Sequence, residues 1–213
     1  MPLLGLLVTS FIVGLSGALM PGPLFVATVR GTYLYGPLAG PLVTLGHGLI
    51  ELVAVLALAF GLGQFVSSEL VMAVVGLAGG SALVFLGSGM IRDGLRGRLA
   101  LAEASGKDGA GRFGPIVSGL VASVVNPYWI TWWLTIGASY VLLSLRQGWL
   151  GLPFFYTGHI LSDLIWLTFV SVALSQGRRL IGERFYTGLI LGCGLFLLAL
   201  AGWFIYSGLG ALR

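Results

Sequence analysis

Residues 41–52 read PLVTLGHGLIEL and residues 153–164 read PFFYTGHILSDL, two versions of one motif separated by 112 positions. The two histidines of the protein, His47 and His159, occupy the same place in both versions. Each histidine is followed four residues later by an acid. This duplication predicts that the chain is built from two related halves.

The composition places both halves in a membrane. The 213 residues are 57% hydrophobic and 8% charged, whereas soluble domains carry about 25% charged residues. Six apolar stretches reach the length of about 20 residues that a helix needs to cross a bilayer. They lie near residues 3–29, 41–65, 69–91, 114–144, 153–176 and 186–210. The sequence therefore predicts an all-α, polytopic membrane protein with six transmembrane helices.

The basic residues predict the orientation of these helices. Five of them lie in the polar segment at residues 92–113, which the positive-inside rule makes a cytoplasmic linker. Arg30 and three arginines at residues 178–184 fall on the same side, which gives nine inside against Arg146 and Arg213 outside. Both termini are then expected outside. This distribution also explains the pI near 9.6 without a nucleic-acid partner.

Three spans in each half mean that the halves enter the membrane from opposite sides. We expect one transporter domain over residues 1–213, made of inverted three-helix repeats near residues 1–91 and 114–213. Inverted repeats are typical of secondary transporters, whose sites lie near the membrane midplane at the repeat interface.

Two acids lie about halfway along predicted spans, Glu51 in the first half and Asp163 in the second. A charge at the bilayer centre costs at least about 2.5–3.5 kcal/mol, so both acids should face a shared interior. His47 and His159 share a helix face with them because of the four-residue spacing. No Lys or Arg lies in a span core, so each acid must be protonated, paired with histidine or neutralised by a transported cation. The alternative is that each pair is only a structural clasp.

Proline interrupts two of the predicted spans. Pro21, Gly22 and Pro23 break the first, and Asn126 and Pro127 break the fourth. Irregular backbone at membrane depth is tolerated only where it is buried in protein or lines a cavity. We therefore expect both breaks to line a site and to act in gating, with a simple packing kink as the alternative.

Several aromatic residues follow the second break, namely Tyr128, Trp129, Trp132, Trp133 and Tyr140. For most of them the sequence favours a belt at the membrane–water interface. Stacking on a cationic substrate is the alternative for the others.

The sequence has no pattern typical of an enzyme. The single Cys193 excludes an internal disulfide and a cysteine-based metal site. A serine–histidine–acid set, a metalloprotease motif and a dinucleotide fingerprint are all missing from the sequence. The chain is therefore expected to be a non-enzyme without a cofactor.

Taken together, these residues resemble the lysine exporter family, LysE/RhtB, over nearly the whole chain. That family has a Pro-Gly-Pro break in its first helix, matched by Pro21-Gly22-Pro23, and an Asn-Pro in its fourth, matched by Asn126-Pro127. Its second helix carries a Gly-x-x-x-Gly-Asp-like element, where this chain has Gly-His-Gly-Leu-Ile-Glu. The resemblance implies export of amino acids such as lysine, arginine, threonine or homoserine, driven by ion gradients. The wider superfamily also includes metal-ion transporters.

The first hypothesis is a proton-coupled exporter of amino acids or similar small metabolites in the inner membrane. Glu51 and Asp163 would bind the substrate ammonium or the coupling proton, and His47 and His159 would tune these acids or relay protons. Asn126 and the breaks would bind the carboxylate. The alternative is a divalent metal cation transporter that uses the two His/acid pairs. The sequence leaves the oligomeric state open, a homo-oligomer included.

Overall fold

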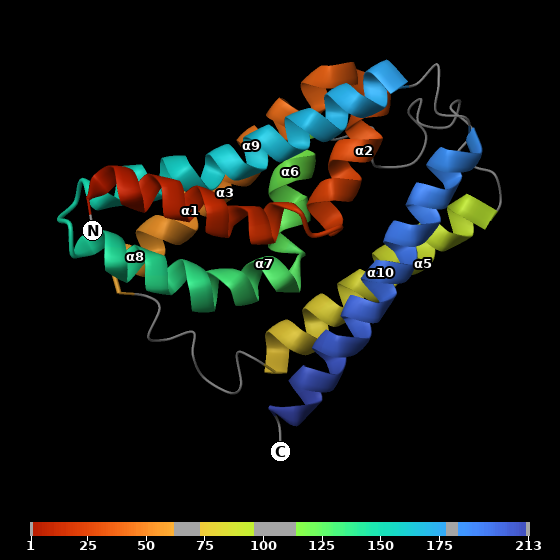
Figure 1. The fold of residues 1–213 in the computed structure, drawn as a ribbon. Coiled ribbons are helices and arrows are strands. Elements are labelled where there is room, and N and C mark those ends of the chain that lie inside the picture. The colour runs from red at the N-terminus through yellow and green to blue at the C-terminus, as the bar shows by residue number, and fades with distance from the viewer. Residues whose placement is uncertain (1, 62–72, 96–113, 178–182, 212–213) are drawn as a thin grey trace.

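The computed structural model of the protein describes residues 2–61, 73–95, 114–177 and 183–211 (Figure 1). Throughout these ranges the chain is helical and forms no strand, which confirms the all-α prediction. α5 runs to Leu95 and so includes the first residues of the segment predicted as a linker. The rest of the predicted linker lies outside the described residues.

The first break separates α1 (Leu3–Ala18) from α2 (Pro23–Tyr35). Pro23 is the first residue of α2, a position where the missing proline N–H removes no helical bond. A 3-10 turn, η1 (Gly36–Leu38), then leads directly into α3 (Ala39–Ala59). Gly36 has a φ of 59°, a conformation that glycine adopts without a steric penalty. After this turn, α3 packs against α2.

The remaining helices follow in chain order. A π-helical turn, η3 (Val75–Gly79), opens α5 (Gly80–Leu95) in the first half. The second half contains α6 (Pro115–Val124), α7 (Pro127–Trp132), the π-helical turn η5 (Trp133–Gly137), α8 (Ala138–Leu145), α9 (Gly151–Gly177) and α10 (Glu183–Gly210).

Three helical stretches of the described chain are long and apolar enough to cross a membrane, namely Pro23–Ala59, Gly151–Gly177 and Leu191–Gly210. The first of them contains the turn at η1. α1 and α6 are apolar but shorter. The 16 residues of α1 extend about 24 Å, less than the hydrocarbon core of about 30 Å. The chain is thus a multi-pass membrane protein, and the count of six spans stays a prediction.

The helices of the two halves pack reciprocally. α1 lies against α9, α6 lies against α3, and α3 and α9 contact each other (Figure 1). Glycines on the long helices allow α6 to approach α3 and α1 to approach α9 this closely. A Cβ on Gly46 of α3 would overlap the carbonyl oxygen of Ile116, and a Cβ on Gly158 of α9 would overlap that of Leu7. Both glycines directly precede the histidine of their motif.

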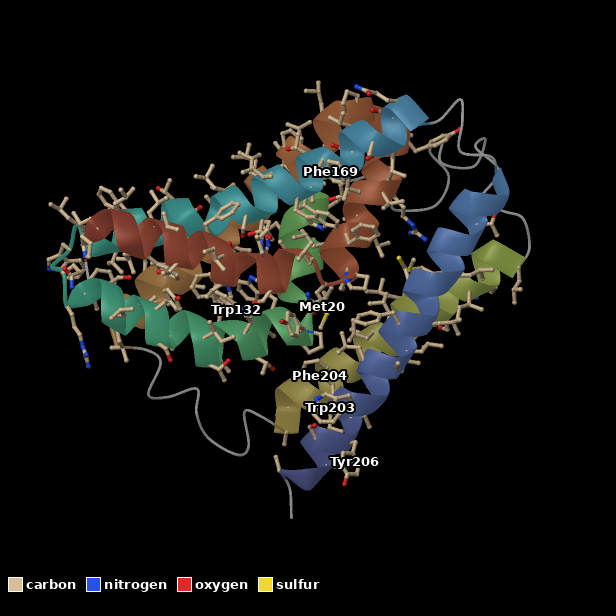
Figure 2. The ribbon with its side chains drawn as sticks, in the orientation of Figure 1. Met20, Trp132, Phe169, Trp203, Phe204 and Tyr206 are labelled. Atoms are coloured by element: carbon tan, nitrogen blue, oxygen red, sulfur yellow. The ribbon has the colours of Figure 1, made fainter. Side chains whose placement is uncertain are left out.

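α5 and α10 form a pair beside this bundle (Figure 1). An apolar cluster joins the pair to α2 and α9; its buried members are Val26, Val29, Leu83, Met90, Val170, Cys193, Leu197, Ala201 and Phe204. Neighbouring side chains point away from this cluster, among them Trp203 and Tyr206 on α10 and Phe169 on α9 (Figure 2). Such exposed apolar groups suit a surface that faces lipid.

Candidate functional site

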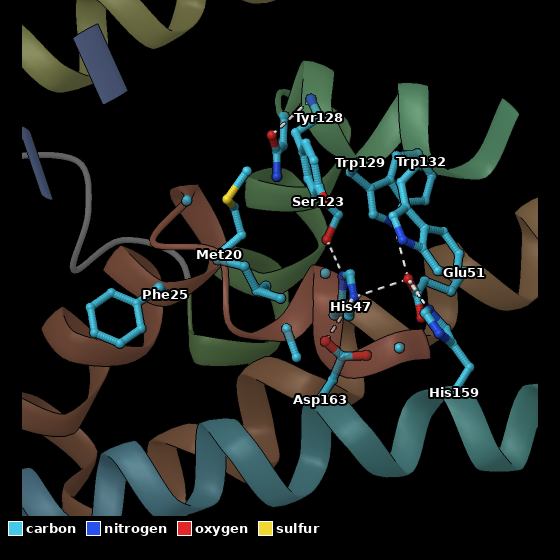
Figure 3. Close-up of a pocket in the computed structure, with 16 residues that line it drawn as sticks. Met20, Phe25, His47, Glu51, Ser123, Tyr128, Trp129, Trp132, His159 and Asp163 are labelled. Carbon is cyan, nitrogen blue, oxygen red and sulfur yellow. Dashed lines mark hydrogen bonds and ion pairs between the residues drawn. The ribbon is translucent and has the colours of Figure 1, made fainter. Parts of the chain in front are cut away.

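The two versions of the motif meet in one pocket between α3 and α9 (Figure 3). It is lined by His47, Glu51, His159 and Asp163. Each of these four residues is buried, with at most 4% of its surface exposed. The i, i+4 spacing turns each histidine and its acid toward the same side of their helix. The fold therefore brings the four predicted residues together, although they come from opposite halves of the chain.

One oxygen of Glu51 is the centre of a hydrogen-bond network. Glu51 Oε1 lies 3.1 Å from Nε2 of His47 and 3.2 Å from Nε2 of His159. It also accepts the indole N–H groups of Trp129 and Trp133, at 3.2 and 3.1 Å. Because an indole nitrogen can only donate, Oε1 acts as an acceptor. Glu51 thus connects the first half of the chain to the second.

The partners of the second motif differ from those of the first. His47 contacts the acid of its own motif, whereas His159 contacts Glu51 rather than Asp163. Asp163 instead approaches the other histidine, with Oδ1 3.8 Å from Nε2 of His47. The hypothesis of two separate His–acid clasps is therefore wrong for the second pair.

Two carboxylate oxygens face this pocket without a hydrogen-bond partner in the described chain, Oε2 of Glu51 and Oδ2 of Asp163. A buried acceptor left unpaired costs about 1–3 kcal/mol, and more when it is charged. A proton or a bound cation would remove this cost. The arrangement is therefore suited to positively charged ligands.

A metal ion is one possible cation on distance alone. Atoms of His47, Glu51 and Asp163 lie within 4.8 Å of one another. However, Oε1 of Glu51 already accepts N–H groups from α9 and from the tryptophans that follow the second break. We therefore interpret the cluster as a hydrogen-bonded site for a proton or an organic cation and assign no metal to it.

Three tryptophans surround the network. Trp132 stacks on the ring of His159, with centroids 4.6 Å apart and planes at 24°. Trp133 meets the same ring edge-on at 5.4 Å, and Trp129 lines the pocket. The expectation of an interfacial belt is therefore wrong for these three residues. Their spacing of three and four positions, which places them on one helix face, was the sequence signal that could have identified them.

Both breaks reach the pocket, but through only part of their residues. Gly22 and Asn126 line it, and a Cβ on Gly22 would lie 3.5 Å from Asn126 Nδ2. Asn126 Oδ1 accepts the backbone N–H of Tyr128 at 3.1 Å and so caps α7. Pro23 and Pro127 are buried and are the first residues of α2 and α7. Pro21 lies between α1 and α2. None of these three prolines lines the pocket.

The N-terminus of α2 opens toward the same space. No side chain caps this helix, and Leu24 and Phe25 of its first turn line the pocket. First-turn N–H groups have no partner inside their own helix, and they carry the positive end of the helix dipole. The pocket is therefore lined both by two acids and by the first turn of a helix, whose N–H groups favour negative charge.

Ser123 is a pocket residue that the sequence did not indicate. Its Oγ lies 2.6 Å from Nδ1 of His47 and donates to the carbonyl oxygen of Gly119 at 2.7 Å. A serine in an apolar helix is common and gives no signal of its own. Only the packing of α6 on α3 places this hydroxyl against the histidine.

The model of the LysE type translocator family matches residues 15–208. The chain is 29% identical over 203 residues to the "Chemotactic transduction protein ChpE" of Pseudomonas aeruginosa, a match that covers 94% of this chain and 97% of that protein. No solved structure matches the chain.

Proposed function

Because this chain belongs to the LysE type translocator family, we propose that it is a proton-coupled secondary transporter that exports amino acids or similar small metabolites across the inner membrane. Membership of a translocator family makes transport, rather than catalysis, the activity to explain. The observation that carries the proposal is the single pocket in which Glu51, Asp163 and both histidines converge.

The charges around the pocket favour a zwitterionic cargo. Oε2 of Glu51 and Oδ2 of Asp163 offer unpaired acceptors for an ammonium group. The first turn of α2 and Nδ2 of Asn126 offer donors for a carboxylate, as the half-helix ends of other transporters do. Among the residues that the structure describes, no lysine or arginine lines this pocket. An amino acid carries both groups on adjacent atoms and so suits this arrangement better than a simple anion does.

The histidines supply a means of coupling to protons. Histidine is the side chain whose charge changes closest to neutral pH. Both rings lie against Glu51, so uptake of a proton and binding of a cation would compete for the same negative charge. Such competition is what an exchanger of protons for a cationic group requires.

The reciprocal packing of the two halves supports alternating access. α1 on α9 and α6 on α3 are equivalent contacts if the halves are inverted repeats. In our proposal, small shifts of the breaks at Gly22 and Asn126 open the pocket to one side and then to the other. The cytoplasmic position of the linker and the external termini belong to the same proposal.

Proteoliposomes test the function directly. We expect vesicles containing the purified protein and loaded with a radiolabelled amino acid, such as lysine or threonine, to lose label faster when protons are driven inward. A protonophore should remove the acceleration. The variant Asp163→Asn should lose it as well, because the amide cannot neutralise an ammonium group.

The same vesicles distinguish amino-acid export from the alternative hypothesis, transport of a divalent metal cation. The close approach of His47, Glu51 and Asp163 is the observation that supports metal transport, and the family match does not favour metal transport. Efflux of a divalent metal without efflux of any amino acid would replace our proposal by that alternative. Efflux of neither would contradict both.

Trp133→Phe is expected to slow efflux by about tenfold or less, since hydrogen bonds to charged groups contribute about 1.5–3 kcal/mol and part of the loss is recovered by the other donors. The change removes one N–H bond to Glu51 and keeps an aromatic ring in place. Trp203→Phe is the matched control because Trp203 is 67% exposed on α10. Initial efflux rates of the two variants should differ, and equal rates would contradict a role for the indole.

A further inference from the structure

The two histidines of the pocket differ on the side that faces away from Glu51. Nδ1 of His47 lies 2.6 Å from the hydroxyl of Ser123 on α6. In the other half, α1 places Gly14 at the corresponding position, where a Cβ would lie 2.8 Å from Nδ1 of His159. This Nδ1 is buried and has no hydrogen-bond partner in the described chain. The pseudo-symmetry of the two halves is therefore broken at one hydroxyl group.

The hydrogen bonds around Ser123 restrict the protons on His47. The carbonyl oxygen of Gly119 can only accept, so the hydroxyl proton lies in the 2.7 Å bond to it. Nδ1 of His47 must then carry a proton to make its own bond to Ser123 Oγ. On the opposite edge of the ring, Nε2 lies 3.1 Å from Glu51 Oε1. This contact also needs a proton between the two atoms. In this arrangement the His47 ring and Glu51 together hold two protons, one on Nδ1 and one between Nε2 and Oε1. A neutral imidazole beside an ionised carboxylate would hold only one.

A turn of the hydroxyl accommodates the loss of that proton. Ser123 can rotate its proton from Gly119 to Nδ1 of His47 as the ring releases the Nδ1 proton to the pocket, which both side chains line. Nε2–H continues to donate to Glu51, and Gly119 keeps the backbone bond of its helix. One proton leaves, the carbonyl of Gly119 gives up only its bond from Ser123, and His47 remains hydrogen-bonded on both edges in either state.

We propose that Ser123 is a positioning residue that makes His47, rather than His159, the histidine that takes up and releases the coupling proton. The proposal rests on the transport function proposed above and names the proton carrier within that site. His159 cannot act in the same way because Gly14 offers no hydroxyl. In its neutral form it donates through Nε2 to Glu51 and leaves Nδ1 without a proton.

Other titratable groups lie around His47 on three helices. Glu51 belongs to α3, and Asp163 and His159 belong to α9. Tyr128 of α7 lines the same pocket. Neither α1 nor α6 carries a titratable side chain, so the hydroxyl is the group through which α6 can affect the ring.

Nuclear magnetic resonance can follow each ring separately, because the protein has two histidines. Protein labelled with 15N in the imidazole rings is titrated in detergent micelles, and His159→Gln identifies the signals of His47. Ser123→Ala should move the titration midpoint of His47 to lower pH by about one unit, because the charged ring loses an acceptor and bonds to charged groups are the stronger ones. Ser123→Thr keeps a hydroxyl and should restore the midpoint.

Ser144→Ala is the matched control. Ser144 is also buried and donates to the carbonyl four residues earlier, at 2.6 Å, but it does not line the pocket. It should leave both histidine titrations unchanged. An unchanged His47 midpoint in Ser123→Ala, or a shift confined to His159, would overturn the proposal.

Transport by the same variants links the titration to coupling. The pH midpoint of proton-driven efflux should move with that of His47 in Ser123→Ala and return in Ser123→Thr. A His47 midpoint that moves while the efflux midpoint stays would show that His47 is not the coupling group. If the wild-type protein carries no amino acid, the transport function fails, whereas the ring titration still decides whether Ser123 controls His47.

Discussion

Glu51→Gln is expected to reduce proton-driven efflux by at least about tenfold, since hydrogen bonds to a charged acceptor contribute about 1.5–3 kcal/mol each and 1.4 kcal/mol corresponds to a factor of ten. The amide keeps the shape of the side chain but removes the negative charge on which four N–H donors converge. It also replaces the unpaired Oε2 by a donor, which would repel a substrate ammonium group. The rate is measured in proteoliposomes at matched protein density.

The control for this prediction makes the same chemical change at the first residue of α10. Glu183→Gln should leave efflux unchanged, because α10 contributes no described residue to the lining of the pocket. Size-exclusion profiles should show that all variants fold. Glu51→Gln and Asp163→Asn that both retain wild-type efflux would contradict the proposed function, since no negative charge would then be required in the pocket.

Gly46→Ala is expected to lower the melting temperature in detergent by roughly 2–12 °C, because overpacking costs about 1–3 kcal/mol and each kcal/mol corresponds to about 2–4 °C in a chain of this size. The added methyl group would overlap the backbone carbonyl of Ile116 on α6. Backbone cannot move aside as a flexible side chain can, so α6 must shift away from α3. Gly158→Ala should have a similar effect through Leu7 on α1.

Two glycines of α10 provide matched controls for this effect. A Cβ on Gly192 or Gly202 meets no atom within 4 Å. Alanine is the better helix former by about 1 kcal/mol, so these variants should melt at the wild-type temperature or slightly above it. A melting temperature of Gly46→Ala equal to that of Gly192→Ala would show that α6 does not approach α3 as closely as described.

The helices themselves could be predicted from the sequence with little ambiguity. Apolar composition over about 20 residues indicates a membrane helix, and proline at Pro23 and Pro127 removes the donors that a continuous helix needs. The predicted fifth and sixth spans correspond to α9 and α10 within three residues at each end. The fourth predicted span, residues 114–144, corresponds to α6 through α8, and the chain leaves the helix within it at the predicted break before Pro127.

The partners within the site could not be predicted in the same way. Spacing along one helix places His47 beside Glu51, but it says nothing about contacts between helices. Only the packing of α3 on α9 turns His159 toward Glu51 and brings Asp163 near His47. The tryptophans were assigned to the membrane interface for the same reason, since the direction of α7 after the break depends on its neighbours.

The sequence by itself determined that this is a helical membrane protein with two versions of one motif, two broken helices and buried acids that need a positive partner. These properties follow from hydrophobicity, proline chemistry and the cost of charge in a bilayer, which act locally along the chain. The tertiary structure alone decided which groups share the pocket. It joined both halves at Glu51 and gave His47 a hydroxyl partner that His159 lacks. Hydrogen-bond partners depend on distances between helices. Close packing at Gly46 sets the distance between α3 and α6, and close packing at Gly158 sets that between α9 and α1.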